Sequence, residues 1–70
     1  MKTILLKATN GNFDIQVGSL VFYTHDEDIN RLRICQITRL YNKDKLECLE
    51  NNKITDYGIR WDRFKIIKII

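Results

Sequence analysis

The chain has 70 residues, with 12 Lys or Arg and 9 Asp or Glu, and its formal net charge is +3 at pH 7. This length allows one small domain, and the mild, interspersed charge lacks the one-sided basic surface of strong nucleic-acid binders. We find no secretory leader pattern and no apolar run long enough to span a bilayer, so we expect a cytoplasmic protein without a membrane partner.

The residue usage is biased. Ile, Asn and Lys make up 24 of the 70 residues, Ala occurs once and Pro is absent. This bias is typical of an AT-rich genome. Together with the small size, it suggests a protein encoded by a phage or another mobile element.

Six runs of strand length follow one another along the chain. They are KTILLKA (2–8), DIQVGSLVFY (14–23), RLRICQITRL (31–40), KLECLE (45–50), ITDYGIRW (54–61) and KIIKII (65–70). Turn signals separate them, and no window of helical length holds a 3.6-residue apolar stripe. The pattern predicts an all-β domain of five to six short antiparallel strands. At this size we expect a closed barrel, because closure removes exposed sheet edges.

The layout of residues 17–70 resembles that of SH3-like small barrels, including Tudor and KOW-type domains. VGSLVFY (17–23) is similar to their entry strand, THDEDIN (24–30) to the long loop after it, and 33–50 to their central hairpin. The resemblance implies a single helical turn at WDRF (61–64) before the closing strand. Residues 1–16 fall outside it and are expected to form an added N-terminal hairpin.

A second feature of the resemblance is the tripeptide DYG at 56–58, which echoes a Tudor motif. The residues after it depart from the Tudor pattern. Recognition of a methylated ligand therefore has no support from this motif.

The stretch TDYGIRWDRFKII (55–67) sets aromatic rings among cations, which is compatible with a nucleic-acid stacking platform. Strand alternation, however, places Tyr57, Ile59 and Trp61 on one face and the charged residues on the other. A small core needs its aromatic side chains for burial. We therefore predict that these rings belong to the core.

The basic residues near the C-terminus form a candidate patch. It comprises Arg60, Arg63, Lys65 and Lys68, with Arg33 and Arg39 from the central hairpin as further candidates. Such a patch would hold phosphates of a nucleic acid. The simpler interpretation is that these residues solubilise exposed strands and block pairing at sheet edges.

Asp26, Glu27 and Asp28 form an acidic run in the predicted loop 24–30. In SH3-like barrels this loop borders the ligand groove, so the resemblance implies that these acids meet basic residues of a protein partner. An acidic run beside a basic end suits a protein interface. It suits a phosphate track less well, because the acids repel the backbone.

Catalysis and cofactor binding have little support. Ser19 and His25 are the only Ser and His, and nothing in the sequence brings them together as a catalytic pair. His25 beside flexible carboxylates does not make a metal site of defined geometry. No glycine-rich phosphate loop is present. We expect no enzyme, no cofactor, no metal and no small-molecule substrate.

Cys35 and Cys48 lie on strands that we expect to pair. A three-residue turn at 42–44 places Cys48 opposite Thr38, and one more turn residue places it opposite Arg39. Either register puts the two sulfur atoms beyond disulfide reach. We therefore predict two free cysteines that fill the core.

These features favour a non-enzymatic binding protein, an adaptor or inhibitor that occupies the surface of a protein partner, with host machinery as its target. The alternative is a weak, sequence-tolerant nucleic-acid binder that uses the basic end. A small barrel is compatible with both functions.

Overall fold

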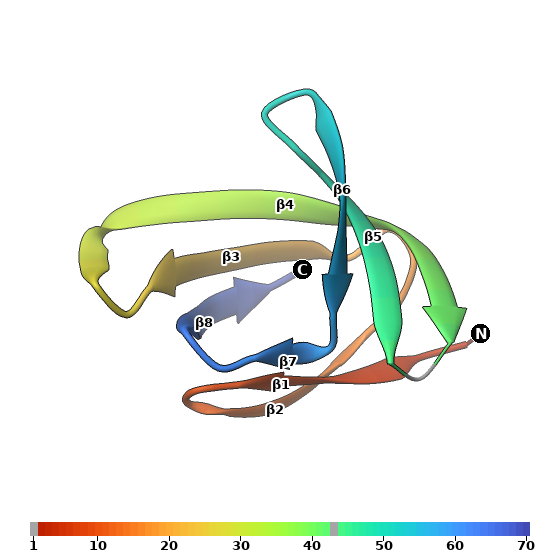
Figure 1. Cartoon of the computed structure of the whole chain (residues 1–70), viewed down its shortest axis with the longest axis horizontal. Coiled ribbons are helices and arrows are strands. Elements are labelled where there is room, and N and C mark those ends of the chain that lie inside the picture. The colour runs from red at the N-terminus through yellow and green to blue at the C-terminus, as the bar shows by residue number, and fades with distance from the viewer. Residues whose placement is uncertain (1, 43) are drawn as a thin grey trace.

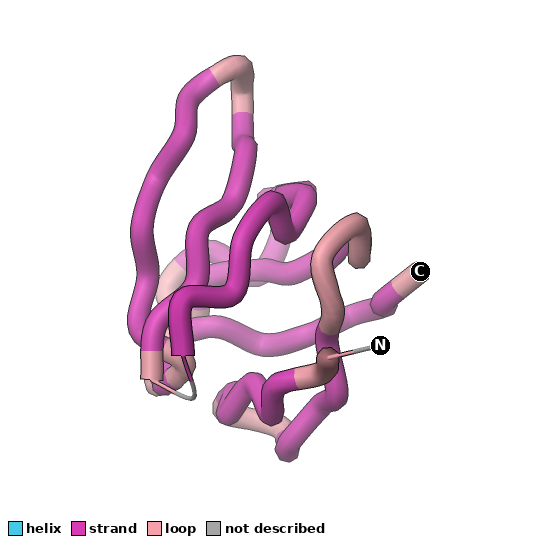
Figure 2. Tube along the Cα trace, turned by 90° about the vertical axis from the view of Figure 1, so that its right-hand side faces the viewer, coloured by secondary structure: helices cyan, strands magenta, loops and turns pink. Residues whose placement is uncertain are grey.

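The computed structural model describes residues 2–42 and 44–70, and all regular structure in this part of the chain is β-strand (Figure 1). Short turns connect the strands, as the trace in Figure 2 shows. In chain order the strands are β1 Ile4–Ala8, β2 Gly11–Ile15, β3 Leu20–His25, β4 Asp28–Asn42, β5 Lys45–Glu50, β6 Lys53–Gly58, β7 Arg60–Trp61 and β8 Phe64–Ile69. The prediction of an all-β fold is confirmed.

The strands form two sheets. One has the order β2-β1-β7 and the other the order β6-β5-β4-β3-β8. All pairs are antiparallel except β1 with β7, where Lys7 lies opposite Arg60 and Ala8 opposite Trp61. Strand pairing therefore does not close the described residues into a single barrel.

The connection at 61–64 differs from the predicted helical turn. Trp61 stays in β7 and Phe64 begins β8, so the turn consists of Asp62 and Arg63 alone. Two residues are too few for one turn of α-helix, which needs 3.6. The pairing of Trp61 with Ala8 keeps residue 61 extended and excludes the helical turn.

Two predicted strands are each divided between the sheets. The run 14–23 is interrupted after Ile15 by a turn in which Gly18 has φ of 95° and the Ser19 amide donates to the Gln16 carbonyl at 3.0 Å. The left-handed φ favours glycine, because other residues meet a steric penalty there. The run 54–61 passes at Ile59 from β6 into β7. These crossings carry the chain from one sheet to the other.

The core lies between the two sheets. The N-terminal hairpin β1–β2 contributes Ile4, Leu6 and Ile15 to it, so this hairpin is an integral part of the fold. The larger sheet contributes side chains that are fully buried, among them Tyr23 and Ile37. Further core residues are Val21, Cys35, Leu46, Cys48, Trp61 and Ile66.

Trp61 is 2% exposed, and its indole nitrogen donates to the Gly58 carbonyl at 3.1 Å. Tyr57 and Ile59 are half-buried and pack against the core. The prediction that these three side chains share the core-facing side is confirmed. The aromatic stretch is therefore not a stacking platform on the surface.

The register between β4 and β5 differs from both predicted registers. Cys48 lies opposite Ile37, because β4 carries one extra residue at Thr38 and another at Tyr41. Cys35 and Cys48 consequently lie on the same face of the sheet, both buried and both free. A hydrogen bond to Cys48 and burial raise the pKa of the Cys35 thiol. Both cysteines are free core residues, as predicted, but the predicted separation of their sulfur atoms is wrong, because the new register brings the two thiols into contact.

The edge of β8 is closed by side chains of the turn between β1 and β2. The Asn10 amide nitrogen donates to the Ile66 carbonyl at 2.8 Å, and the Ile66 amide donates to the Asn10 side-chain oxygen at 3.0 Å. Thr9 adds backbone and hydroxyl bonds to the Phe64 carbonyl, each of 3.0 Å. This arrangement imitates strand pairing and joins the N-terminal hairpin to the larger sheet.

We predict that Asn10→Ala lowers the free energy of unfolding by about 1–3 kcal/mol, because it leaves the amide and carbonyl of Ile66 without partners. Urea denaturation measures the loss. Asn12→Ala is the matched control, since Asn12 is exposed on β2 and its change should stay within about 0.5 kcal/mol. Equal effects of the two substitutions would contradict this role for Asn10.

Candidate functional site

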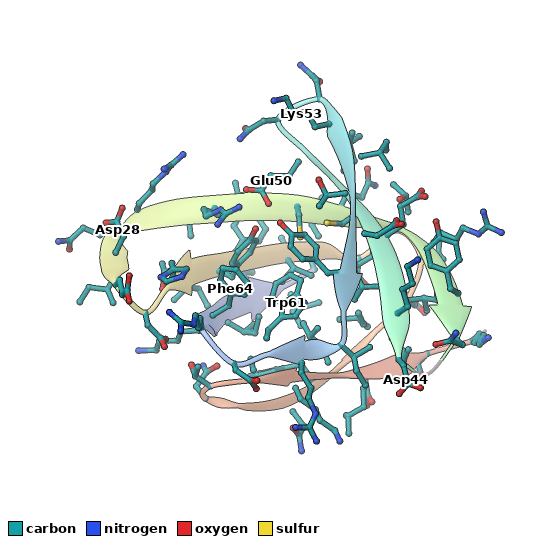
Figure 3. All side chains as sticks on the ribbon, viewed as in Figure 1. Asp28, Asp44, Glu50, Lys53, Trp61 and Phe64 are labelled. Carbon is teal, nitrogen blue, oxygen red and sulfur yellow. The ribbon has the colours of Figure 1, made fainter. Side chains whose placement is uncertain are left out.

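The inner face of the larger sheet, which is the face turned towards the core, carries a group of aromatic rings. The Tyr23 ring lies 4.9 Å from Trp61 and 5.0 Å from Phe64, measured between centroids. Phe64 also meets Trp61 at 5.2 Å and His25 at 5.4 Å (Figure 3). Tyr23 and Trp61 are buried, whereas Phe64 and His25 are half-buried. The rings thus extend from the core to the surface.

Arg33 lies on these rings. Its guanidinium carbon is 5.1 Å from the Tyr23 centroid and 5.6 Å from the Phe64 centroid, within the range of a cation–π interaction. The Arg33 Nε donates to a Glu50 carboxylate oxygen at 2.9 Å. The Tyr23 hydroxyl donates to the other oxygen of the same carboxylate. We call His25, Phe64, Arg33, Tyr23 and Glu50 the Arg33 cluster.

Hydrogen bonds and stacking connect the members of the Arg33 cluster. The Glu50 side chain is only 10% exposed, and it accepts from both a phenol and a guanidinium. Burial and the hydrogen bond to Glu50 raise the pKa of the Tyr23 hydroxyl well above its ordinary value. Tyr23 therefore remains a donor across the physiological range, and Arg33 is fixed in one orientation on the half-exposed ring of Phe64.

The acidic residues lie at the tip of the β3–β4 hairpin, which projects from the sheet (Figure 1). Asp26 and Glu27 form a two-residue turn, because Asp28 already pairs with His25. The predicted long loop is therefore a tight hairpin turn. Beyond it, four residues of β4 (29–32) lie opposite a single residue of β3, which is an irregularity in the pairing.

The acidic tip meets the basic end of the chain. The Asp26 amide donates to the Arg63 carbonyl at 2.8 Å, and the Arg63 guanidinium lies 3.6 Å from the Glu27 carboxylate. Both side chains of this ion pair are largely exposed, so it contributes little stability. It does show that acidic and basic residues share one surface.

The other four predicted basic residues lie on three different strands. Arg60 is on β7 in the smaller sheet, opposite Lys7. Lys65 and Lys68 are exposed on β8, at the edge of the larger sheet. Arg39 lies over the Tyr41 ring at 4.6 Å. The structure thus gathers Asp26, Glu27, Asp28, Arg33 and Arg63 around the β3–β4 hairpin, and Lys65 lies next to it, opposite Thr24 of β3. The remaining three, Arg39, Arg60 and Lys68, are distributed over both sheets.

The sequence analysis did not identify Glu50, Phe64 and Tyr23 as parts of a site. Glu50 reaches Arg33 only because two extra residues in β4 shift the register with β5. Phe64 has a weak signal in the sequence, since it follows Arg63 in the aromatic and basic stretch 55–67. Tyr23 has none, because a Tyr within a strand is ordinarily a core residue.

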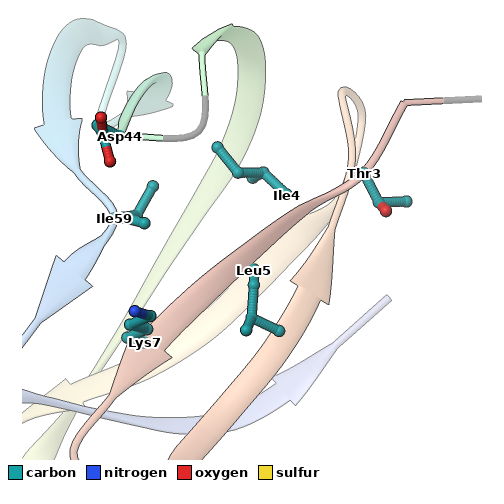
Figure 4. A pocket seen from close by; sticks show the side chains of 6 residues that line it. All are labelled: Thr3, Ile4, Leu5, Lys7, Asp44 and Ile59. Atoms are coloured by element: carbon teal, nitrogen blue, oxygen red, sulfur yellow. The ribbon is translucent and has the colours of Figure 1, made fainter.

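A shallow cavity of about 450 Å³ lies on the other side of the molecule, between β1 and the segment that joins β6 to β7 (Figure 4). It is lined by Thr3, Ile4, Leu5, Lys7, Asp44 and Ile59. One basic and one acidic side chain among apolar groups do not form a catalytic arrangement. Within residues 2–42 and 44–70, no three His, Cys, Asp or Glu side chains are grouped to hold a metal ion.

No family model matches the chain, and neither the curated proteins nor the solved structures contain a significant match to it. In the part of the chain that the structure describes, we find no helix with the length and apolar character to cross a membrane.

We predict that Tyr23→Phe lowers the free energy of unfolding by about 1–2 kcal/mol at pH 7, because the buried Glu50 carboxylate loses a donor. The pKa of the Tyr23 hydroxyl is raised in the folded state. As the pH rises above 10.0, the hydroxyl therefore loses its proton in the unfolded chain before it does so in the folded protein. The wild type therefore loses stability above that pH, and the difference from the variant narrows. Urea denaturation from pH 7 to 10.5 measures this.

Tyr41→Phe serves as the control, because Tyr41 also donates to a carboxylate, that of Glu47, but at the surface. Its loss at pH 7 should be smaller than that of Tyr23→Phe. A stability difference for Tyr23→Phe that is negligible at pH 7, or that widens above pH 10, would contradict the buried Tyr23–Glu50 hydrogen bond.

Proposed function

We propose that the chain is a non-enzymatic protein-binding module, an adaptor or inhibitor, that occupies a partner's surface with the Arg33 cluster and the adjoining tip of the β3–β4 hairpin. The observation that supports this most is the fixed position of Arg33, between the half-exposed Phe64 ring and the Glu50 carboxylate. Tyr, Trp and Arg dominate the residues that contribute most to protein–protein binding energy.

Preorganisation supports the same proposal. A partner that binds Arg33 and Phe64 orders few additional side chains, because stacking and the Glu50 ion pair already hold them. Ordering a flexible side chain costs about 0.5–1.5 kcal/mol at an interface. Binding by this face avoids part of that cost. Ile29, which is exposed on the same hairpin directly after the acidic run, offers additional apolar area.

The finer assignment of the fold is part of the proposal. We infer that residues 17–70 form a variant of the SH3-like small barrel, with the N-terminal hairpin added to it. The layout that resembles these barrels places the β3–β4 hairpin beside their ligand groove. The Arg33 cluster then lies where a peptide or protein surface would bind. The biased residue usage extends the proposal to a phage or mobile-element protein directed at host machinery.

Nucleic-acid binding fits the same surface less well. Asp26, Glu27 and Asp28 stand at the tip, and Arg63 already faces Glu27. A phosphate backbone would meet acids there and would have to displace that ion pair. Arg60 lies on the smaller sheet and is not part of the β8 edge that carries Lys65 and Lys68.

Site-specific photo-crosslinking tests the proposal. A benzophenone amino acid replaces Ile29 on the β3–β4 hairpin, and in a control chain it replaces Val17, which is similarly exposed between β2 and β3. In an extract of the source cells, we expect one discrete protein adduct from position 29 and none from position 17.

Competition makes the test specific. Excess wild-type chain should abolish the adduct, whereas Arg33→Lys should compete at least tenfold less well, because lysine keeps the charge but lacks the planar group that stacks on Phe64. Equal adducts from both positions, or equal competition by both chains, would contradict a role for the Arg33 cluster in binding.

A further inference from the structure

The tip of the β3–β4 hairpin is held by hydrogen bonds from both amides of its two-residue turn. The Asp26 amide donates to the Arg63 carbonyl at 2.8 Å. The Glu27 amide donates to Nδ1 of the His25 ring at 3.0 Å. The first acceptor is a backbone carbonyl, which keeps its lone pairs at every pH. The second is an imidazole nitrogen, which accepts only while it carries no proton.

The backbone geometry of this turn makes such support necessary. The favoured two-residue hairpin turns, types I′ and II′, need a positive φ at one or both central residues. Outside glycine, the residues that the structure describes have a positive φ only at Asn51 and Asn52, which connect β5 and β6. The turn at Asp26 and Glu27 is therefore not of a favoured hairpin type, and bonds from outside its own backbone have to hold it.

Strand pairing supports the β4 side of the tip only weakly. His25 pairs with Asp28. The next pair between β3 and β4 is Tyr23 with Arg33, and residues 29–32 between these pairs lack regular partners on β3. β3 itself is paired with β8 as far as His25. The β4 side of the tip therefore depends on the two amide hydrogen bonds of the turn.

The hydrogen bond from Glu27 determines the tautomer of His25. A neutral imidazole carries one proton, and acceptance at Nδ1 places that proton on Nε2. A second proton binds at Nδ1, where it points at the Glu27 N–H from a nitrogen that is 3.0 Å away. Two donors cannot satisfy each other, so protonation of His25 breaks this bond.

Charged groups around His25 come from the hairpin, from the start of β8 and from the Arg33 cluster. They are Asp26, Glu27, Asp28, Asp62, Arg63, Lys65, Arg33 and Glu50. Two ion pairs, Arg63 with Glu27 and Arg33 with Glu50, engage part of this set. Within the described part of the chain, Asp26 and Asp28 take part in no ion pair. An imidazolium that loses the Glu27 amide therefore has carboxylates nearby to which it can donate.

We propose that His25 is a pH switch for the tip of the β3–β4 hairpin. Neutral His25 holds the Glu27 amide and keeps the turn in place. Protonation moves one proton from solvent to Nδ1, breaks the hydrogen bond, directs the ring towards the carboxylates of the tip and releases the turn. Imidazoles ordinarily change charge between pH 5 and 8, so the switch operates near physiological conditions.

The switch acts on the surface to which we assign partner binding, so its effect on binding rests on the proposed function. His25 belongs to the Arg33 cluster, and its ring meets Phe64 edge-to-face at 5.4 Å between centroids. A released tip has to be ordered again when a partner binds, which lowers the affinity. We expect binding at neutral pH and release of the partner as the solution becomes acidic.

Nuclear magnetic resonance of the full ¹⁵N-labelled chain between pH 8 and pH 5 tests the switch. His25 is the only histidine, so the ring-nitrogen signals belong to it alone. At pH 8 we expect the Nε2–H tautomer and a coupling across the hydrogen bond between the Glu27 amide nitrogen and Nδ1. At pH 5 the coupling should vanish, and the protection of the Asp26 and Glu27 amides against hydrogen exchange should fall at least tenfold.

Two controls separate the switch from general effects of acid. The turn at Asn51 and Asn52 contains no histidine, so its amides should keep their protection at pH 5. His25→Asn should hold the tip at both pH values, because an asparagine side chain bonds the backbone two residues on and does not titrate. Its Asp26 and Glu27 amides should therefore change less than twofold in protection.

Crosslinking from position 29 tests the effect on binding. The yield of the protein adduct should fall at least fivefold from pH 7.5 to pH 5.5 when residue 25 is histidine. It should fall less than twofold in the same chain with His25→Asn. Titration of the partner's own groups affects both chains alike, so the difference between them reports on His25.

An Nδ1–H tautomer at pH 8, or tip amides that stay protected at pH 5, would overturn the switch. These outcomes are independent of the crosslinking result, since the resonance experiment contains no other protein. An adduct yield that falls equally with and without His25 would overturn the regulation of binding and leave the proposed function intact.

Discussion

Trp61 connects the two sheets, and the arrangement of the rest of the molecule depends on its burial. Its backbone pairs with Ala8 in the smaller sheet, while its ring meets Tyr23, Tyr57 and Phe64 of the larger one. Full burial of a large aromatic side chain is among the strongest favourable terms available to a chain of this size. Pairing of the two-residue strand β7 with β1 positions this ring in the core.

Burial of Trp61 also determines what the surface can do. The ring draws Phe64 and Tyr23 around it, and Arg33 then stacks on the outer side of those rings. The aromatic residues thus serve the core first and shape the proposed binding face second. A face of this kind, with a fixed Arg and a buried carboxylate, suits a protein surface better than a row of phosphates.

The sequence alone predicted the all-β class and the burial of Trp61. Alternate residues along 57–61 are apolar, and this alternation directs them to the core whether a residue belongs to β6 or to β7. It did not predict where strands change sheets. The break at Ile59 follows a single glycine, Gly58, inside a strand pattern, and the one at 16–19 depends on a single glycine with φ of 95°. Local patterns carry no information on such crossings.

The candidate site was partly predictable. The acidic run and Arg63 were identified from charge alone, and the structure places them together. The pairing of Arg33 with Glu50 depends on extra residues in β4 at Thr38 and Tyr41, which alternation does not reveal.

Fluorescence titration of a labelled oligonucleotide at physiological salt tests most directly the claim that this surface recognises protein and not nucleic acid. The account predicts no binding tighter than about 10 μM, in the range of weak non-specific contacts. Submicromolar binding that is lost when Arg60, Arg63, Lys65 and Lys68 are changed to Glu would contradict it. A log–log salt slope near −3, as four phosphate contacts would produce, would identify the chain as a nucleic-acid binder.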